Sequence, residues 1–313
     1  MRLVTFKTNE GEAGDGQRLG AVVAGQIVDL VRLAQTGAGA TLPSSMLDLV
    51  AAGPDAWNRA RELIADHAAR LDRLPGGVVF PMSGVTLLAP IPRPTKNVFC
   101  LGINYSAHLE ESNRAAGRDL NPTVPVFFTK AVTSIVAPGA PILFDEAVTV
   151  KYDWEAELGV VIGLGGRSIP RERAMEHVFG YTCFNDVSAR DVQNLHVQWF
   201  RGKSLDGTCP FGPWIVTADE VPDPHNLSIE CRVNDVVKQS SNTSYLINDI
   251  PAIIYHLSNG LTLEPGDLIS TGTPSGVGYA RTPPEFLKPG DIVEVEVERV
   301  GVLRNPVVDI NER

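Results

Sequence analysis

The sequence is organised around one strand-like stretch, Tyr152-Asp153-Trp154-Glu155-Ala156-Glu157-Leu158-Gly159-Val160-Val161-Ile162-Gly163. Side chains of a β-strand alternate between its two faces, so Glu155 and Glu157, at i and i+2, point the same way. Two neighbouring carboxylates on a partly buried face repel each other and are costly to desolvate. A hard divalent cation removes that cost, and Mg²⁺, Mn²⁺ and Ca²⁺ all prefer oxygen ligands. The stretch therefore predicts a strand that carries part of a metal site.

A third carboxylate, Asp186, follows the next apolar run, residues 178–184, and completes the predicted set of ligands. The competing interpretation is that two alternate glutamates only mark the solvated face of a strand. Residues 292–298 illustrate that ordinary case, because valines alternate there with glutamates and predict a half-exposed strand. Spacing alone favours the ordinary case, whereas the remaining motifs of the chain favour the metal site.

Composition and charge limit the classes to which the protein can belong. The chain has 313 residues, of which 43% are hydrophobic and 20% charged, which is typical of a globular protein long enough for two domains. A net charge of −10 without a basic run argues against nucleic acid and anionic membranes as partners. No apolar run approaches the roughly 18 residues of a membrane span, and the first residues do not resemble a signal peptide. The four cysteines are widely spaced, which predicts reduced thiols and a cytoplasmic protein.

Two units are predicted, residues 1–90 and residues 91–313, with the boundary in Pro90-Ile91-Pro92-Arg93-Pro94. The first unit combines a strand, a hairpin across Ala24-Gly25 and two helices, for which Ser45 (with capping-box spacing to Asp48) and Asp55 are the predicted caps, and it carries no recognisable chemistry. The second unit has many short strands and few helices. The predicted fold class is therefore α+β and mainly β: a small N-terminal α+β domain followed by a mixed β-sandwich or roll. We expect the first unit to support a dimer or the rim of the pocket.

A strand ending in Gly102 precedes a polar segment in which His108 and Glu111 are spaced i, i+3. On a helix these two side chains share one face. A carboxylate beside an imidazole fixes the orientation of the ring and raises its basicity, as a general base requires. An exposed ion pair is the competing interpretation, and it is the commoner one for such a pair in isolation. The polar residues 112–122 that follow have the composition of a mobile lid.

Basic and amide side chains follow Asp186 along the chain. Arg190 and Gln193 are spaced i, i+3, so on a helix they form one face that suits a substrate carboxylate. The same spacing is at least equally compatible with an exposed helix surface. Lys203 stands alone in the turn-like segment 200–206, where a lysine is usually solvated. Only the surrounding motifs make these residues candidates for a site.

Two glycine-rich segments do not predict nucleotide binding. Residues 163–166 lack the G-x-G-x-x-G order, and no βαβ alternation surrounds them. Residues 271–278, Thr-Gly-Thr-Pro-Ser-Gly-Val-Gly, lack the Gly-Lys-Ser/Thr of a phosphate loop. The backbone amides of this second segment and the Thr273 hydroxyl can still receive a small anion or an oxyanion.

Five ordered motifs together resemble the fumarylacetoacetate hydrolase family over roughly residues 97–308. The motifs are Leu101-Gly102-Ile103-Asn104-Tyr105 with His108, Asp153-Trp154-Glu155-Ala156-Glu157-Leu158, Asp186-Val187-Ser188-Ala189-Arg190-Asp191-Val192-Gln193, Gly202-Lys203-Ser204 and Thr271-Gly272-Thr273-Pro274-Ser275-Gly276-Val277-Gly278. The segments 240–243 and 284–290 make the chain most similar to the two-domain subgroup of proteins that contain this hydrolase domain. The chain departs from the family pattern at Leu205, where many members carry Phe, and this position bears on substrate choice.

The resemblance implies a homodimer built on a β-rich roll, with Mg²⁺ or Mn²⁺ held by Glu155, Glu157 and Asp186. It implies that His108 and Glu111 activate water on a closing lid, and that Lys203 stabilises charge or moves a proton. It also implies substrate contacts from the remaining motif residues, Asn104, Tyr105, Arg190, Gln193 and Thr273.

The expected substrate is a small 2-oxo or β-diketo acid. The first hypothesis is metal-dependent hydrolysis of a C–C bond in an acylpyruvate-like substrate, which gives a 2-oxo acid and a carboxylic acid. Three alternatives share the metal-bound enolate: decarboxylation of oxaloacetate, keto–enol isomerisation, and isomerisation or hydration of a 2-hydroxy-dienoate in aromatic or sugar-acid catabolism. A metal-binding scaffold without activity is the alternative from another class, and the intact set of candidate residues argues against it.

Overall fold

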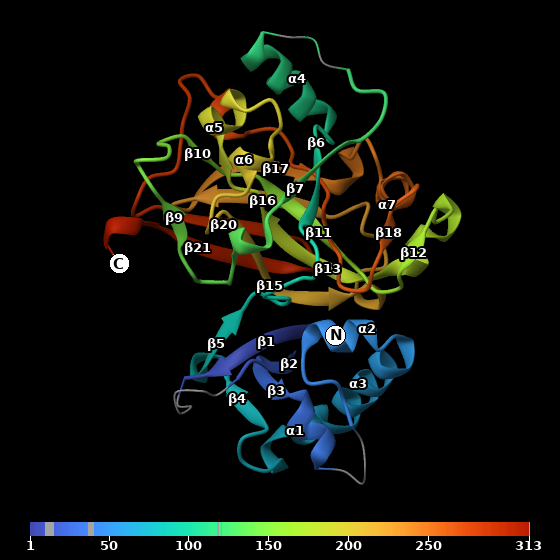
Figure 1. Cartoon of the computed structure of the whole chain (residues 1–313). Coiled ribbons are helices and arrows are strands. Elements are labelled where there is room, and N and C mark those ends of the chain that lie inside the picture. The colour runs from blue at the N-terminus through green and yellow to red at the C-terminus, as the bar shows by residue number, and fades with distance from the viewer. Residues whose placement is uncertain (10–15, 37–40, 118, 120, 313) are drawn as a thin grey trace.

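The computed structural model describes residues 1–9, 16–36, 41–117, 119 and 121–312. Strand residues outnumber helical residues among them, which confirms the expected α+β, mainly β fold. Figure 1 shows the N-terminal elements, in blue, at one end of the molecule and helices α4, α5 and α6 toward the opposite end. These three helices span Ser106–Ala116, Arg190–Leu195 and Phe200–Lys203.

The N-terminal unit contains the hairpin that the sequence predicts. Strands β2 and β3 pair antiparallel on either side of Ala24 and Gly25, which both have positive φ. Ser45 begins α2 as its capping-box spacing predicts, because its side chain accepts the N–H of Asp48. The elements are β1 (Arg2–Thr8), β2 (Arg18–Val23), β3 (Gln26–Asp29), β4 (Val79–Pro81), β5 (Val85–Leu88), α1 (Leu30–Gln35), α2 (Met46–Ala51) and α3 (Pro54–His67).

One large sheet crosses the predicted domain boundary. Its strand order is β4-β3-β2-β1-β15-β13-β11-β19-β6-β7, with β5 on β1 and β8 on β15. Because β1 pairs with β15, with Leu3 opposite Ile215, strands of the two predicted units are hydrogen-bonded to each other. The division of the chain at residue 90 stays a prediction. The further strands are β6 (Val98–Gly102), β7 (Val126–Lys130), β8 (Ile135–Val136), β11 (Ala156–Ile162), β13 (Val178–Asn185), β15 (Cys209–Thr217) and β19 (Leu268–Ser270).

A second sheet of five strands packs against the large one. Its order is β17-β16-β20-β21-β9, and it shares a hydrophobic core with β11, in which Leu158 and Val160 lie with Val293 and Val295 of β20. Its strands are β9 (Ile142–Phe144), β16 (Ser228–Val233), β17 (Val236–Asn242), β20 (Ile292–Val297) and β21 (Gly301–Asp309). The remaining elements are the short pairs β10 (Tyr152–Asp153) with β14 (Ser188–Ala189) and β12 (Gly166–Arg167) with β18 (Thr262–Leu263), and helix α7 (Ile250–Ser258).

Strands β11 and β20 show why the same glutamate spacing has two outcomes. β20 alternates between buried valines and half-exposed residues, as the sequence predicts. β11 lies between β13 and β19 inside the large sheet, and all seven of its residues are buried. Its packing is close: a Cβ added at Gly159 would lie 2.3 Å from the Phe184 ring. A carboxylate in this strand therefore lies in the interior of the protein.

Two of the predictions made from the sequence concern the state of the cysteines and the presence of a membrane span. The four cysteines, Cys100, Cys183, Cys209 and Cys231, are buried and free. No helix in the described part of the chain is both long and apolar enough to cross a membrane.

Candidate metal centre and active site

Glu155, Glu157 and Asp186 meet in the interior, as the sequence predicts. Each offers an oxygen that lies within 4.8 Å of those of the other two, and all three residues are buried. Glu155 immediately precedes β11, and Asp186 immediately follows the neighbouring strand β13. The antiparallel register of these strands brings the two together, and the Asp186 N–H donates to the Glu155 carbonyl oxygen at 2.9 Å.

Three buried cations surround these carboxylates. Lys203 Nζ lies 2.6 Å from Glu155 Oε2 and 2.7 Å from Asp186 Oδ2. Arg190 Nη2 lies 2.6 Å from Glu155 Oε1. Lys130, at the end of β7, is fully buried and lies 2.7 Å from Asp186 Oδ1. Sequence reasoning missed Lys130, for which the only signal was a lysine that ends an apolar strand.

Glu157 is the carboxylate of the three whose negative charge these cations balance least. Its Oε2 accepts hydrogen bonds from the Ser270 hydroxyl at 2.5 Å and from the Gly272 N–H at 2.7 Å, but no ion pair reaches it from the described residues. Burial, together with Asp186 and Glu155, raises its pKa well above the ordinary value. Burial would also raise the pKa of Glu155, but Lys203 and Arg190 outweigh burial and hold that pKa below its ordinary value.

The donor set fits a divalent cation. With Asp153, which pairs with Arg190, four buried carboxylates face the three cations Lys130, Arg190 and Lys203, so one negative charge is left over. Three convergent carboxylates and no sulfur or imidazole are the ligands that a hard cation such as Mg²⁺ or Mn²⁺ prefers. A cation there would hold Glu157 in its anionic form.

Three glycine N–H groups of the 271–278 segment bind the protein's own carboxylates. The donors are Gly272, Gly276 and Gly278, and the acceptors are Glu157, Glu111 and Asp153, respectively. Gly272 has a φ of +99°, which glycine adopts without strain. These three N–H groups therefore help to arrange the site and are not free to bind a substrate anion, whereas anion binding by the rest of the segment stays a prediction.

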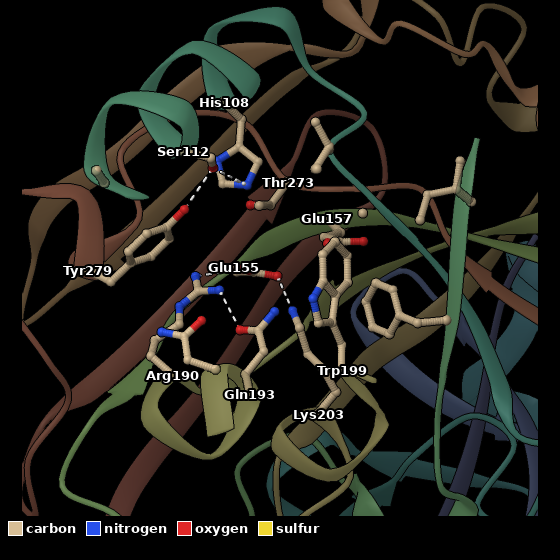
Figure 2. A pocket seen from close by; sticks show the side chains of 16 residues that line it. His108, Ser112, Glu155, Glu157, Arg190, Gln193, Trp199, Lys203, Thr273 and Tyr279 are labelled. Carbon is tan, nitrogen blue, oxygen red and sulfur yellow. Dashed lines mark hydrogen bonds and ion pairs between the residues drawn. The ribbon is translucent and has the colours of Figure 1, made fainter. Parts of the chain in front are cut away.

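His108 and Glu111 form the expected pair on α4. Nδ1 of His108 lies 2.9 Å from Glu111 Oε1, and both side chains are buried. When the Glu111 carboxylate is ionised it accepts a hydrogen bond from Nδ1, and Nε2 is then the ring nitrogen that can act as a base. His108 lines a cavity of about 140 Å³, and Figure 2 shows its ring above Glu155 and Thr273.

Both charged and apolar side chains line the cavity. The charged ones include Glu155, Glu157, Arg190 and Lys203, and the apolar ones include Leu101, Phe128 and Trp199. Trp199, which sequence reasoning missed, contacts Phe128 edge-on and lies directly over Gly102, where an added Cβ would be 2.1 Å from the indole. The available sequence signal is Gly102 itself, because glycine is the only type of residue small enough to fit beneath the indole ring.

Arg190, Gln193 and Thr273 all line the cavity, as predicted. Arg190 Nε donates to Asp153 at 2.8 Å, and Nη1 donates to Gln193 Oε1 at 3.2 Å. With Nη2 paired to Glu155, only the remaining N–H groups of Arg190 can receive a substrate carboxylate. The Thr273 hydroxyl donates to the Ala156 carbonyl, so it has acceptor capacity but no free proton for a ligand.

Asn104 and Tyr105 are not among the residues that line this cavity, and their contacts with a substrate stay a prediction. Asn104 is fully buried, and its amide donates to the Asn248 and Thr271 carbonyl oxygens and accepts from the Asn248 backbone and side chain. Its hydrogen-bonding capacity is therefore used within the protein. Tyr105 is also buried, and its hydroxyl has no hydrogen-bond partner among the described residues.

Residues 97–308 match the family model described as fumarylacetoacetate (FAA) hydrolase C-terminal. The chain is 43% identical over 267 residues to the oxaloacetate tautomerase YisK of Bacillus subtilis, covering 85% of this chain and 87% of the relative. It is 41% identical over 312 residues to the mitochondrial oxaloacetate tautomerase fahd2 of Xenopus laevis, covering 98% of this chain and 90% of the relative.

Solved structures agree with this relationship. A fumarylacetoacetate hydrolase from Exiguobacterium antarcticum is 39% identical, with a TM-score of 0.80 over 99% of both chains. A maleylpyruvate hydrolase from Sphingobium sp. SYK-6, solved in complex with manganese(II) and pyruvate, is 32% identical, with a TM-score of 0.75 over 99% of both chains.

Proposed function

The chain belongs to the fumarylacetoacetate hydrolase family, and we propose that it is a divalent-metal-dependent enzyme that interconverts the enol and keto forms of oxaloacetate or a similarly short 2-oxo diacid. The names of the relatives in Bacillus subtilis and Xenopus laevis support this activity. The buried carboxylate triad and the His108–Glu111 pair beside it support the chemistry.

The observation that carries the proposal is the place of His108, which lines a small charged cavity while its Nδ1 lies 2.9 Å from Glu111 Oε1. Tautomerisation moves a proton between a carbon and an oxygen, so it needs one base beside a polarised carbonyl. Hydrolysis needs, in addition, a positioned water and room for the acyl group that leaves. A cavity of about 140 Å³ is comparable to one that holds benzene, so it supports a substrate of few carbons.

Each part of the site has a proposed task. Glu155, Glu157 and Asp186 would hold the metal, which when bound supplies a Lewis acid that polarises the carbonyl oxygen. In the keto-to-enol direction His108 Nε2 removes a proton from the carbon beside the ketone and then returns it, from the protonated imidazole, to the oxygen of the resulting enolate. Both transfers reverse in the enol-to-keto direction.

Two cations assist this transfer. Burial would lower the pKa of Lys203, but Asp186 and Glu155 outweigh burial and raise it, so Lys203 stays an ammonium ion that stabilises developing negative charge. The remaining N–H groups of Arg190, with Gln193 beside them, would orient a substrate carboxylate. The proposal also includes Mg²⁺ or Mn²⁺ as the metal, a homodimer and a cytoplasmic location.

Hydrolysis of an acylpyruvate is the second candidate. It is favoured by the similarity to the maleylpyruvate hydrolase and by the position of His108, which suits a base that deprotonates water. In that reaction His108 would activate a water for attack on the distal carbonyl of the substrate.

One set of assays separates the two. Freshly dissolved enol-oxaloacetate is mixed with the protein and Mg²⁺, and loss of the enol absorbance is followed with and without EDTA. Acetylpyruvate is tested in parallel, with pyruvate and acetate quantified by chromatography. Metal-dependent loss of the enol above the buffer rate, with acetylpyruvate intact, supports the tautomerase. Release of pyruvate and acetate with no effect on the enol refutes it in favour of the hydrolase.

A further inference from the structure

Tyr279 lines the cavity and contacts both Arg190, the proposed substrate-binding residue, and Ser112, which lies beside the proposed base His108. Its ring lies over the Arg190 guanidinium, with 4.4 Å between Arg190 Cζ and the ring centroid. Its hydroxyl donates to Ser112 Oγ of helix α4 at 2.7 Å, and Ser112 Oγ lies 3.5 Å from His108 Nε2. Figure 2 shows this chain of contacts leading from Tyr279 through Ser112 to the His108 ring.

The backbone around Tyr279 is fixed by the same carboxylate that holds Arg190. Asp153 is fully buried and accepts the N–H groups of Gly278 at 2.6 Å and Tyr279 at 3.1 Å, besides Arg190 Nε. Gly278 has no room for a side chain, because an added Cβ would lie 2.7 Å from Asp153 Oδ1. Asp153 therefore fixes the position of the Tyr279 backbone relative to the Arg190 guanidinium.

We propose that Tyr279 is a positioning residue with two separable contributions: its ring orients Arg190 for the substrate, and its hydroxyl, through Ser112, holds helix α4 so that His108 faces the cavity. For its kinetic consequences this inference rests on the proposed function. Nothing in the sequence motifs pointed to either residue, because Ser112 lay in the expected lid segment and Tyr279 follows the glycine-rich segment by one position.

The hydrogen bond between Tyr279 and Ser112 is suited to hold helix α4 in place at neutral pH. Burial raises the pKa of Tyr279 above its ordinary value, so the phenol remains a neutral donor at neutral pH. The Ser112 hydroxyl both accepts this hydrogen bond and has a proton to offer toward His108 Nε2. Tyr279, Ser112 and His108 all line the cavity, so α4 cannot move outward without breaking the Tyr279–Ser112 hydrogen bond.

Two substitutions separate the ring from the hydroxyl. Tyr279→Phe keeps the ring over Arg190, so kcat should fall roughly three- to tenfold while KM stays within about twofold. Tyr279→Leu removes both contacts, so KM should rise as well, by roughly tenfold. Tyr245→Phe, at a tyrosine that is 63% exposed, is the matched control and should change neither parameter.

The partner residue provides a double-mutant cycle. Ser112→Ala should reproduce the loss caused by Tyr279→Phe, and the double variant should be no worse than either single one, because all three lack the same hydrogen bond. Ser112→Thr retains the hydroxyl and should stay close to wild type. Losses that multiply in the double variant would overturn the inference, as would a Tyr279→Phe variant with wild-type kcat.

Hydrogen exchange provides a readout that does not depend on turnover. In Tyr279→Phe and Ser112→Ala the amides of α4 should exchange faster than in wild type, whereas the Tyr245→Phe control should not differ. Unchanged exchange of the α4 amides in both variants would refute the proposal that the Tyr279–Ser112 hydrogen bond holds α4, even if kcat falls. If wild type converts no 2-oxo acid, the proposed function fails, and the exchange experiment still decides whether Tyr279 holds α4.

Discussion

Glu111 accepts the backbone N–H of Gly276, 165 residues further along the chain, with both of its carboxylate oxygens at 3.0 Å. The same carboxylate accepts the hydrogen bond from His108 Nδ1. The imidazole on helix α4 is therefore oriented by the glycine-rich segment that also binds Glu157, one of the proposed metal ligands. The proposed base and the proposed metal ligands thus line one cavity with different side chains and are connected through one loop.

The His108–Glu111 pair should affect turnover without affecting metal binding. We expect His108→Ala to lower kcat by roughly a hundred- to ten-thousandfold, because it removes the base. Glu111→Gln should lower kcat less, since a glutamine oxygen can still accept from Nδ1. Mg²⁺ affinity, measured by calorimetry, should stay at the wild-type value in both variants. A parallel loss of metal affinity would contradict the separation of the two sites.

The triad should be required for metal binding. Glu155→Gln is expected to abolish calorimetrically detectable Mg²⁺ binding and turnover, because it removes one of three carboxylate ligands. Glu296→Gln on β20 is the matched control, at a glutamate of the same i, i+2 spacing that is partly exposed. The control should bind Mg²⁺ like wild type and change stability by less than about 1 kcal/mol. Normal Mg²⁺ binding by Glu155→Gln would refute the metal site.

Metal binding should depend on pH through Glu157. Its folded-state pKa is raised, so in the metal-free protein its contribution to stability is present below the unfolded-state pKa and is lost as pH rises through the folded-state pKa. A metal replaces the proton, so the Mg²⁺-induced rise in Tm should grow as pH rises above the ordinary pKa of a glutamate toward the raised folded-state pKa of Glu157. Calorimetry in buffers of different ionisation enthalpy should detect release of up to about one proton per Mg²⁺. A Tm rise that is independent of pH, with no proton release, would show that Glu157 is already ionised.

Lys130 should be essential to the metal-free fold. Lys130→Met leaves Asp186 Oδ1 buried without its cation, which should lower the free energy of unfolding by about 3–5 kcal/mol. Mg²⁺ would return positive charge to the same cluster, so the variant should gain more in Tm from Mg²⁺ than wild type does. Thermal melts with and without Mg²⁺ measure both quantities. Equal gains for the two proteins would mean that Lys130 and the metal act independently.

Local sequence patterns predicted the features that depend on neighbours along the chain. The hairpin across Ala24-Gly25, the Ser45 cap and the alternating strand β20 follow from turn chemistry, capping and period-two burial. The same local rules placed a cap at Asp55, but α3 begins one residue earlier, at Pro54, after Gly53. Boundaries of this kind are decided by backbone geometry that several residues satisfy equally well.

Features of the site that join distant segments could be predicted only in part. The Glu155, Glu157 and Asp186 cluster was predictable, because the carboxylates end or begin adjacent apolar strands. The hydrogen-bond partners of Asn104, which are Asn248 and Thr271, lie 144 and 167 residues away, and no local pattern reveals them.

Lys130 and Tyr279 were missed for the same reason. A lysine at a strand end and a tyrosine after a glycine-rich segment are ordinary locally, and only the fold brings them to Asp186 and Ser112.

The most direct test of the central claim is exchange of the C3 hydrogens of keto-oxaloacetate with deuterium, followed by NMR in D₂O with Mg²⁺. We predict that wild-type protein accelerates this exchange well above the buffer rate, that EDTA removes the acceleration, and that His108→Ala returns it to the buffer rate. Exchange at the buffer rate with wild type, or undiminished exchange with His108→Ala, would contradict the account of a metal-dependent tautomerase with His108 as its base.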